Sequence, residues 1–166
     1  MPEMEIRVFG DPVLKEKSTD VKKIDEDLKG LIDNLTDTMY AAPGSGLAAS
    51  QVGVTKRVFV FDVGEGLHVC INPKMTVIEE ESTNEDFSEG CLSLNGINLI
   101  IKRCGKIGLD YTDEHGKKQH LEAEGLEARV IQHEMDHLDG LLILDRADRE
   151  ERAQALKILR SGLLSS

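Results

Sequence analysis

The sequence predicts an α+β fold in which antiparallel β-sheets pack around a central helix that carries two histidines, with N-terminal and C-terminal helices. Three observations support this fold class. Apolar residues recur with helical spacing near the N-terminus, short β-branched runs fill the middle of the chain, and helical spacing returns after residue 124. The 166 residues contain no internal repeat and no linker, so we expect one domain over residues 1–166.

The first predicted element is a helix over residues 25–41. Acidic residues at positions 25–27 suit the positive end of the helix dipole, and Pro43 with Gly44 is expected to end the helix. Its apolar residues fall on one face, which we expect to be buried, and they are Ile24, Leu28, Leu31, Ile32, Leu35 and Met39.

Residues 57–124 predict an antiparallel sheet. Runs such as "RVFVFDV", "LHVCINP" and "KIGLDYTD" are rich in β-branched and aromatic residues and are separated by Gly, Asn or Pro. The stretch "TDEHGKK" at residues 112–118 is typical of a hairpin turn between two such runs.

Helical spacing returns in "GLEARVIQHEMDHLDG", residues 125–140. We expect Leu126, Val130 and Leu138 on the buried side of this central helix and Gly140 at its end.

The C-terminal part predicts one further helix. "LLIL" at residues 141–144 is expected to form a short buried strand or turn. Asp148 and Glu151 resemble a capping box that opens a last helix reaching about Leu164. Its apolar face is predicted to consist of Ala153, Leu156, Leu159 and Leu163.

Composition narrows the class of partner. Lys and Arg total 20 against 31 Asp and Glu, and the net charge of −11 disfavours DNA and anionic membranes as partners. Without Trp, the two Tyr and four Phe offer little surface for stacking bases. The N-terminus has no apolar signal core and the three cysteines have no paired spacing, so we expect reduced thiols and a cytoplasmic protein.

The stretch "QHEMDHLDG", residues 132–140, predicts a metal site. On a helix, His133 and His137 project from the same face and could hold one ion together. Glu134 can reach a water on that ion without being a ligand, which suits a general base. The alternative is a pair of ordinary histidines, and the glutamate between them favours metal binding.

The third ligand separates the classes of metal hydrolase. Metzincin proteases place a third histidine where this chain has Ile143, and no downstream glutamate stands where thermolysin-like proteases use one. An upstream Asp, Glu, His or Cys must therefore supply the ligand. Cys91 in "EGCLSL" stands out, because Gly90 lets the backbone approach closely and a bound cation would deprotonate the thiol. A small buried hydrophobe is the alternative, and we adopt it for Cys70 and Cys104.

A loop of small residues, "PGSGLAASQVG" at positions 43–53, allows the backbone to pass close to a ligand. The amide of Gln51 could donate a hydrogen bond to an oxygen that gains negative charge in a transition state. Taken alone, the stretch could equally be an ordinary loop.

Together these three stretches resemble the motifs of peptide deformylases. They read "GSGLAASQ" at 44–51, "EGCLS" at 89–93 and "QHEMDHL" at 132–138. Their order and separations resemble the bacterial type with no insertion between the first two motifs. "RVFGDPVL", "INP" and "YTDEHG" also look like the family, so the resemblance covers nearly the whole chain.

The resemblance implies that Cys91, His133 and His137 bind one divalent metal ion with water in the fourth position. A ligand set of two histidines and a cysteine accommodates zinc, iron, nickel or cobalt. Among these, the resemblance favours Fe²⁺, with zinc as a less active substitute.

The resemblance also implies the reaction. The family removes the formyl group from the initiator methionine of nascent bacterial proteins and releases formate. Glu134 would take a proton from the water and later pass it to the leaving amine. The backbone N–H of Leu92 and the side chain of Gln51 would hold the formyl oxygen.

A substrate pocket follows from the same resemblance. The walls of an apolar slot for the methionine side chain would be Phe87, Leu126 and Val130, with Ser45 at the mouth and Gly46 bordering the substrate backbone.

Three charged residues are expected close to this pocket. Glu89 is counted among the substrate-binding residues, and Arg103 resembles a family arginine that braces the site, with Glu89 as its expected partner. Arg129 is placed near the entrance, and a solvated helix face is the alternative for it.

Three positions depart from the family pattern. Ser45 replaces an aliphatic residue, and Ser50 and Asn95 each replace a frequent proline, which should loosen the loops around the cleft. A catalytically weak, deformylase-like metal-binding protein with an interaction role therefore remains as the alternative function. A structural metal site is a further one, and it would take a fourth ligand from Cys70, Cys104 or His68.

The last helix differs in charge from the rest of the chain. Residues 145–166 contain five basic and four acidic side chains, a net +1 in a chain of −11. In the family this helix is associated with docking on the ribosome near the exit tunnel. An amphipathic helix that only closes the core is the alternative.

Overall fold

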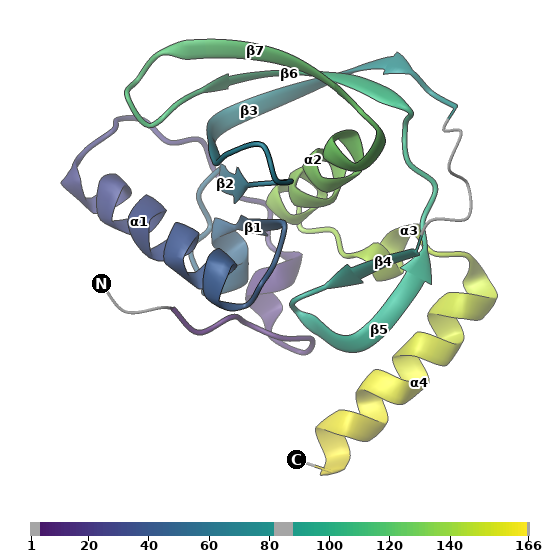
Figure 1. Cartoon of the computed structure of the whole chain (residues 1–166). Coiled ribbons are helices and arrows are strands. Elements are labelled where there is room, and N and C mark those ends of the chain that lie inside the picture. The colour runs from purple at the N-terminus through teal and green to yellow at the C-terminus, as the bar shows by residue number, and fades with distance from the viewer. Residues whose placement is uncertain (1–3, 82–87, 166) are drawn as a thin grey trace.

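The computed structural model describes residues 4–81 and 88–165 and confirms the predicted α+β class (Figure 1). Within these residues the larger sheet has five antiparallel strands in the order β1-β2-β3-β6-β7, and β4 pairs with β5 in a separate hairpin. The elements are η1 (Pro12–Lys15), α1 (Glu26–Ala41), β1 (Gly46–Ala48), η2 (Ala49–Val52), β2 (Val58–Phe61), β3 (His68–Glu79), β4 (Ser88–Cys91), β5 (Leu94–Ile100), β6 (Lys106–Thr112), β7 (Lys118–Glu124), α2 (Gly125–Leu138), α3 (Ile143–Arg146) and α4 (Arg149–Ser165), where η denotes a 3-10 helix.

Helix α1 forms where the apolar spacing predicts it. The side chain of Asp25 accepts a hydrogen bond from the backbone N–H of Leu28 at 2.9 Å and so caps the first turn. The predicted apolar face is buried from Leu28 to Met39, and it shares one core cluster with residues of β1 and β2. The helix ends at Ala41, shortly before the proline and glycine that the sequence offers as a stop.

The larger sheet confirms the antiparallel prediction. All four residues of β2 are buried, as its continuous apolar run requires of a strand covered on both faces. The predicted hairpin turn joins β6 to β7, where the carboxylate of Asp113 accepts hydrogen bonds from the N–H groups of His115 and Lys117, both at 2.9 Å. Gly116 supplies the positive φ of +80° in this turn.

Helix α2 lies against the larger sheet, in the middle of the molecule (Figure 1). Ala128, Ile131 and Leu138 join a buried cluster with the phenylalanines of β2. Gly140, just beyond the helix, has a φ of +75°, and a Cβ at this position would lie 2.5 Å from the carbonyl oxygen of Lys15. Glycine at the end of α2 therefore permits the close approach of η1.

The prediction that Leu126 faces the core is wrong, because half of its surface is exposed. Leu126 is the second residue of α2, and the first turn of this helix borders an open cleft rather than a packed element. Val130, one turn later, is half-buried, and Leu138 is fully buried as expected.

Three residues of the segment "LLIL", Leu142, Ile143 and Leu144, are buried as predicted, but the segment is neither a strand nor a plain turn. Ile143 begins the one-turn helix α3. The carboxylate of Asp145 accepts a hydrogen bond from the backbone N–H of Leu142 at 2.8 Å. This local bond favours the helical turn over an extended conformation.

Helix α4 begins after Asp148, whose carboxylate accepts a hydrogen bond from the N–H of Glu151 at 2.8 Å, so the predicted cap forms. The expected burial of Ala153 is wrong, since its side chain is exposed. Because α4 extends away from the body (Figure 1), only a narrow stripe of Ala155, Leu156 and Leu159 joins the cluster that includes β5. The side chain of Leu163 lies outside the described residues.

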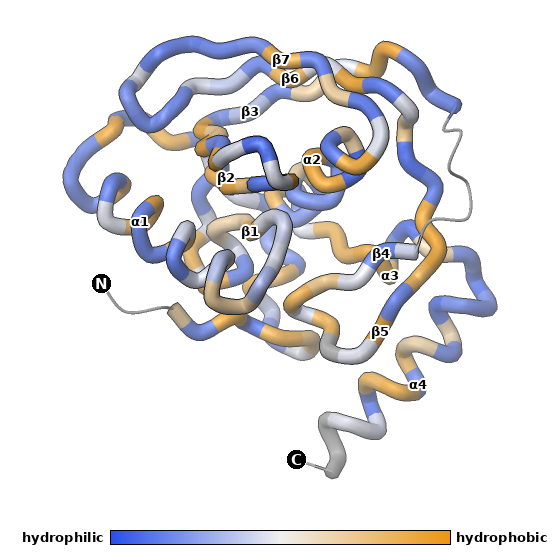
Figure 2. Tube along the Cα trace, viewed as in Figure 1, coloured by the Kyte–Doolittle hydropathy of each residue, from blue (hydrophilic) through white to orange (hydrophobic). Residues whose placement is uncertain are grey.

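Hydrophobic residues gather along β2 and around α2, whereas hydrophilic ones cover much of the hairpin formed by β6 and β7 (Figure 2). No helix in residues 4–81 or 88–165 is both long enough and apolar enough to cross a membrane.

Candidate metal centre

Cys91, His133 and His137 bring their ligand atoms together at the point where β4 meets α2. All three atoms lie within 4.8 Å of one another. The Sγ atom of Cys91 is 3.4 Å from Nε2 of His137, which is 3.2 Å from Nε2 of His133. The structure thus brings together the three residues that the sequence suggested as a ligand set.

Local structure explains why these side chains converge. His133 and His137 are four residues apart on α2 and project from one face, with their ring centroids 4.9 Å apart. Cys91 is the last residue of β4, directly after a shift in register between Gly90 and Cys91. A β-bulge of this kind redirects a side chain, and here the thiol faces the helix.

The chemistry of this site fits a divalent cation. Two imidazoles and a thiolate are a ligand set that zinc and other transition metals accept. Although burial disfavours its charge, contacts with Cys91 and Glu89 raise the pKa of His133 to about 10. The surroundings of His133 therefore attract positive charge, and a metal ion supplies such charge at the same place. The four-ligand structural site is not assembled, because neither Cys70, Cys104 nor His68 joins this group among the described residues.

Glu134 lies beside the ligands on the same helix and is buried. A Cβ on Gly46 would lie 2.7 Å from its Oε2 atom, so the glycine of β1 makes room for the carboxylate. The other oxygen, Oε1, is buried without a hydrogen-bond partner among the described residues. Burial raises the pKa of Glu134 to about 7, which suits a group that takes up and releases a proton near neutral pH.

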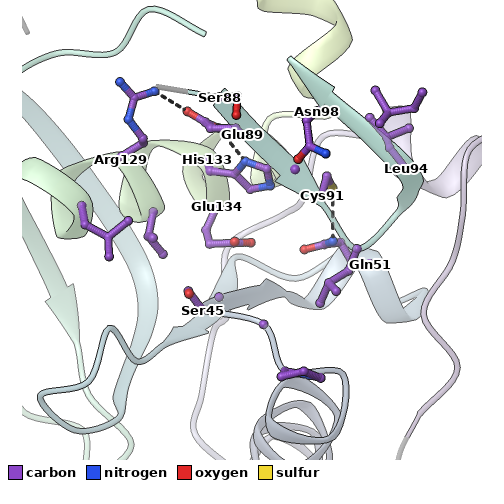
Figure 3. Close-up of a pocket in the computed structure, with 18 of the residues that line it drawn as sticks. Ser45, Gln51, Ser88, Glu89, Cys91, Leu94, Asn98, Arg129, His133 and Glu134 are labelled. Carbon is purple, nitrogen blue, oxygen red and sulfur yellow. Dashed lines mark hydrogen bonds and ion pairs between the residues drawn. The ribbon is translucent and has the colours of Figure 1, made fainter. Parts of the chain in front are cut away.

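The amide of Gln51 is held in a fixed orientation. Its Oε1 atom accepts a hydrogen bond from the backbone N–H of Ala48 at 3.0 Å. The NH₂ group therefore points the other way, toward Oγ of Ser93 at 3.2 Å and Sγ of Cys91 at 3.8 Å (Figure 3). Leu92 follows Cys91 in the turn between β4 and β5 and also lines the cleft.

A cleft of about 470 Å³ opens onto these residues. Its lining includes Ser45, Gly46, Leu126 and Val130, which the sequence suggested as substrate-binding residues. Figure 3 shows Ser45 and Glu89 on opposite sides of Glu134. Phe87, the remaining wall residue suggested by the sequence, lies outside the described residues.

Glu89 lines the same cleft, but both of its oxygens are bound by other protein groups. Arg103 donates to Oε2 at 2.8 Å and to Oε1 at 2.9 Å, Arg129 donates to Oε2 at 3.0 Å, and Nδ1 of His133 lies 2.9 Å from Oε1. Burial opposes the charge, but the hydrogen bonds from Arg103 and His133 lower the pKa of Glu89 to about 2. Glu89 thus holds the ring of one metal-ligand candidate (Figure 3).

The contacts of Arg103 and Arg129 with Glu89 test what the sequence predicted for each arginine. The predicted pairing of Arg103 with Glu89 is confirmed. The solvated helix face considered for Arg129 is wrong, because its side chain is buried and also donates to the carbonyl oxygen of Ile101 at 2.8 Å. Asp136 was not among the residues that the sequence suggested for the site, and it accepts a hydrogen bond from Arg103 at 2.7 Å. The sequence feature that could have identified Asp136 is its position, because it is an acidic residue between the two histidines of α2.

Two of the departures from the family motifs can be placed in the structure. Ser45 is exposed at the cleft. Ser50 is fully buried in η2, and its hydroxyl donates to the carbonyl oxygen of His137 at 3.3 Å. This bond ties η2 to the helix that carries the ligands, which a proline side chain cannot do. The side chain of Asn95 lies outside the described residues.

Known proteins resemble this chain in both sequence and structure. Residues 3–153 match the family model described as polypeptide deformylase. The chain is 44% identical over 157 residues to the peptide deformylase of Acidothermus cellulolyticus, covering 95% of this chain and 86% of the relative. It is 47% identical over 147 residues to that of Thermotoga maritima, covering 89% and 88%.

Solved structures agree. The peptide deformylase from Ehrlichia chaffeensis in complex with actinonin has a TM-score of 0.91 at 35% identity and covers 98% of both chains. The peptide deformylase from Thermotoga maritima has a TM-score of 0.85 at 46% identity and covers 89% of this chain and 99% of that one.

Proposed function

Because this chain belongs to the peptide deformylase family, we propose that Cys91, His133 and His137 hold its metal ion and that Glu134 is its general acid and base. As a member of this family, the chain is a metal-dependent hydrolase that removes the N-formyl group from the N-terminal formyl-methionine of newly made proteins and releases formate. The observation that carries the assignment is the convergence of three donor atoms within 4.8 Å, directly beside a buried glutamate.

Glu134 carries the proton through the reaction. When bound, the metal ion supplies hydroxide at neutral pH and polarises the formyl carbonyl. Glu134 takes the proton that the attacking water loses and delivers it to the amine nitrogen as the C–N bond breaks. An amine is a poor leaving group without that proton, so the carboxylate that Gly46 accommodates acts in both halves of the reaction.

Gln51 and Leu92 stabilise the formyl oxygen as its negative charge grows. The amide of Gln51 needs no reorientation, because Ala48 already holds its carbonyl end at 3.0 Å. The backbone N–H of Leu92 is the second donor, next in the chain to the ligand Cys91.

Substrate selection belongs to the cleft around these groups. Leu126 and Val130 would form the walls for the methionine side chain, and the half-exposed Leu126 is available for that contact. The family resemblance adds Phe87, which lies outside the described residues. Ser45 lies at the mouth and Gly46 borders the substrate backbone. Glu89 completes the substrate-binding set by fixing the ring of His133 at 2.9 Å.

Fe²⁺ is the metal we propose for this site, with Zn²⁺, Ni²⁺ or Co²⁺ as substitutes. The two imidazoles and the thiolate would hold any of these ions, because all of them accept nitrogen and sulfur ligands. We further propose a single deformylase domain that acts in the cytoplasm, where nascent chains emerge. The basic residues of α4 would let it dock on the ribosome.

The first test is formate release from a short formyl-methionyl peptide by anaerobically purified, iron-loaded protein, beside Glu134→Ala and the isosteric Glu134→Gln. We expect formate from the wild type and a loss of at least about 100-fold in both variants, with metal content unchanged. A folded, metal-loaded wild type that releases no formate would contradict the function. Full activity in Glu134→Gln would contradict the role of the carboxylate.

A further inference from the structure

Arg146, the last residue of α3, makes a two-pronged ion pair that the proposed mechanism does not use. Its Nε atom donates to Oδ2 of Asp136 at 2.7 Å, and a terminal nitrogen donates to Oδ1 at 2.8 Å. The side chain of Asp136 is 10% exposed, whereas that of Arg146 is 47% exposed. The guanidinium thus reaches from the surface to a buried carboxylate on the helix of the ligands.

Asp136 also binds a second arginine, which lies deeper in the protein. Its Oδ2 atom also accepts from Nη1 of Arg103 at 2.7 Å, and the side chain of Arg103 is only 3% exposed. The two remaining nitrogens of Arg103 hold the carboxylate of Glu89, which contacts Nδ1 of His133 at 2.9 Å. A chain of ion pairs through Arg146, Asp136, Arg103 and Glu89, which ends at the ring of His133, therefore joins α3 to the metal centre.

Arg146 is the member that orients the outer end of this chain. A guanidinium that binds both oxygens fixes the plane of a carboxylate as well as its position. Without Arg146, the Oδ1 atom of Asp136 loses the donor at 2.8 Å and the carboxylate is free to rotate. Arg103 would then lose its alignment with Asp136, and through Arg103 so would the carboxylate of Glu89.

Groups that orient a metal ligand influence metal affinity. An acceptor on the second nitrogen of a ligating imidazole sets its ring orientation and its basicity, and its removal typically weakens metal affinity or activity by about 10- to 100-fold. Glu89 is that acceptor for His133.

We propose that Arg146 is a positioning residue for the metal centre, acting on His133 through Asp136, Arg103 and Glu89. The proposal rests on the proposed function of Cys91, His133 and His137 as metal ligands. Because three residues stand between Arg146 and the imidazole, the effect of Arg146 should be smaller than that of Glu89.

The test is Co²⁺ binding to the metal-free protein, followed by the visible absorption of the bound ion. Arg146→Gln is expected to weaken Co²⁺ affinity by about 3- to 10-fold and to lower kcat by a similar factor with KM unchanged. Arg146→Lys keeps the charge but not the fork, so its affinity should fall between those of wild type and Arg146→Gln. Lys15→Gln is the matched control, since it removes a 2.6 Å ion pair with Asp145 of α3 that does not belong to this chain of contacts.

A double variant tests the route. Arg146→Gln should weaken Co²⁺ affinity little further in a Glu89→Gln background, because the contact that carries its effect is already lost. Additive effects would mean that Arg146 acts by another route and would overturn the proposal.

Two further results would also overturn it. One is a Co²⁺ affinity of Arg146→Gln within twofold of that of Lys15→Gln. The other is a lower Tm of Arg146→Gln with unchanged Co²⁺ affinity, which is the mark of a purely structural ion pair. If Arg146→Gln does not fold, unchanged affinity in Arg146→Lys overturns the proposal. Co²⁺ binding is read without activity, so failure of the deformylase reaction itself would be seen separately.

Discussion

The carboxylate of Glu134 lies directly against the backbone of Gly46, so closely that a Cβ at position 46 would be 2.7 Å from Oε2 and 3.0 Å from Cγ. One residue belongs to β1 and the other to α2, and nearly ninety positions separate them in the sequence. The glycine therefore determines where the carboxylate that we propose as general acid and base can lie, although it contributes no side chain to the site.

Gly46→Ala should reduce kcat/KM by about 100-fold, because the new methyl group pushes the carboxylate of Glu134 away from the position in which it can transfer the proton. Metal content should remain that of the wild type, since the three atoms nearest to this methyl group all belong to Glu134 and none to a proposed metal ligand. Gly30→Ala in α1 is the matched control, as nothing lies within 4 Å of its added Cβ. That control should keep full activity, and its free energy of unfolding should rise by about 0.5–1 kcal/mol. Equal activity of the two variants would remove the steric argument.

Gln51→Glu should lower kcat by about 100- to 1000-fold, because an NH₂ donor becomes a second acceptor at the place where the formyl oxygen gains negative charge. Steady-state kinetics on a formyl-methionyl peptide, with metal content measured in parallel, checks this result. Gln154→Glu on the exposed side of α4 makes the same chemical change away from the site and should leave kcat unchanged. A Gln51→Glu enzyme with wild-type kcat would exclude the amide from the reaction.

Arg103→Gln should destabilise the protein by about 3–5 kcal/mol, because Glu89 and Asp136 would be left buried without their shared partner. Urea unfolding of the metal-free protein measures this free energy without interference from metal binding. Arg7→Gln removes an exposed ion pair with Asp11 and should cost less than about 1 kcal/mol. The prediction is wrong if the two variants unfold at the same urea concentration.

Tyr111 should make stability depend on pH at alkaline values. Burial raises the pKa of its phenol to about 12 in the folded protein, whereas an unfolded tyrosine has a pKa of about 10. The unfolded state thus loses its proton first, so this contribution to stability is complete below about pH 10 and is lost as the pH rises toward 12.

Tyr111→Phe cannot ionise and should lose less stability than the wild type across that interval. Thermal unfolding of both proteins at pH 9.5 and at pH 11.5 checks the difference between their slopes. Parallel declines in Tm would show that the phenol is not the group responsible.

Much of the fold could be predicted from local patterns. The apolar spacing of α1 and α2 and the hairpin turn at Gly116 depend on neighbouring residues, and each forms where the sequence indicates. Leu126 and Ala153 were placed wrongly because periodicity identifies a helix but not how far the rest of the protein covers it. The one-turn helix α3 is stabilised by the capping bond from the N–H of Leu142 to Asp145 and by backbone bonds within the turn, which together outweigh the strand-like composition of its residues.

By itself, the sequence determined the residue types that carry the chemistry. Cys91, His133 and Glu134 stand in motifs whose spacing indicates a metal hydrolase, because ligand chemistry and helical periodicity are local properties. The same motifs indicated the family before any contact between them was visible.

Only the tertiary structure decided how these residues support one another. The chain of contacts from Arg146 to His133 joins α3, the segment between β5 and β6 that carries Arg103, strand β4 and the central helix α2. The sequence does not indicate which of these distant charged residues pair with one another, because the residue type of an arginine does not show whether its side chain is buried or exposed. Packing brings them within 3 Å of one another and, around Arg103 and Glu89, also excludes water. For that reason we expect their orientation to matter for the proposed metal centre.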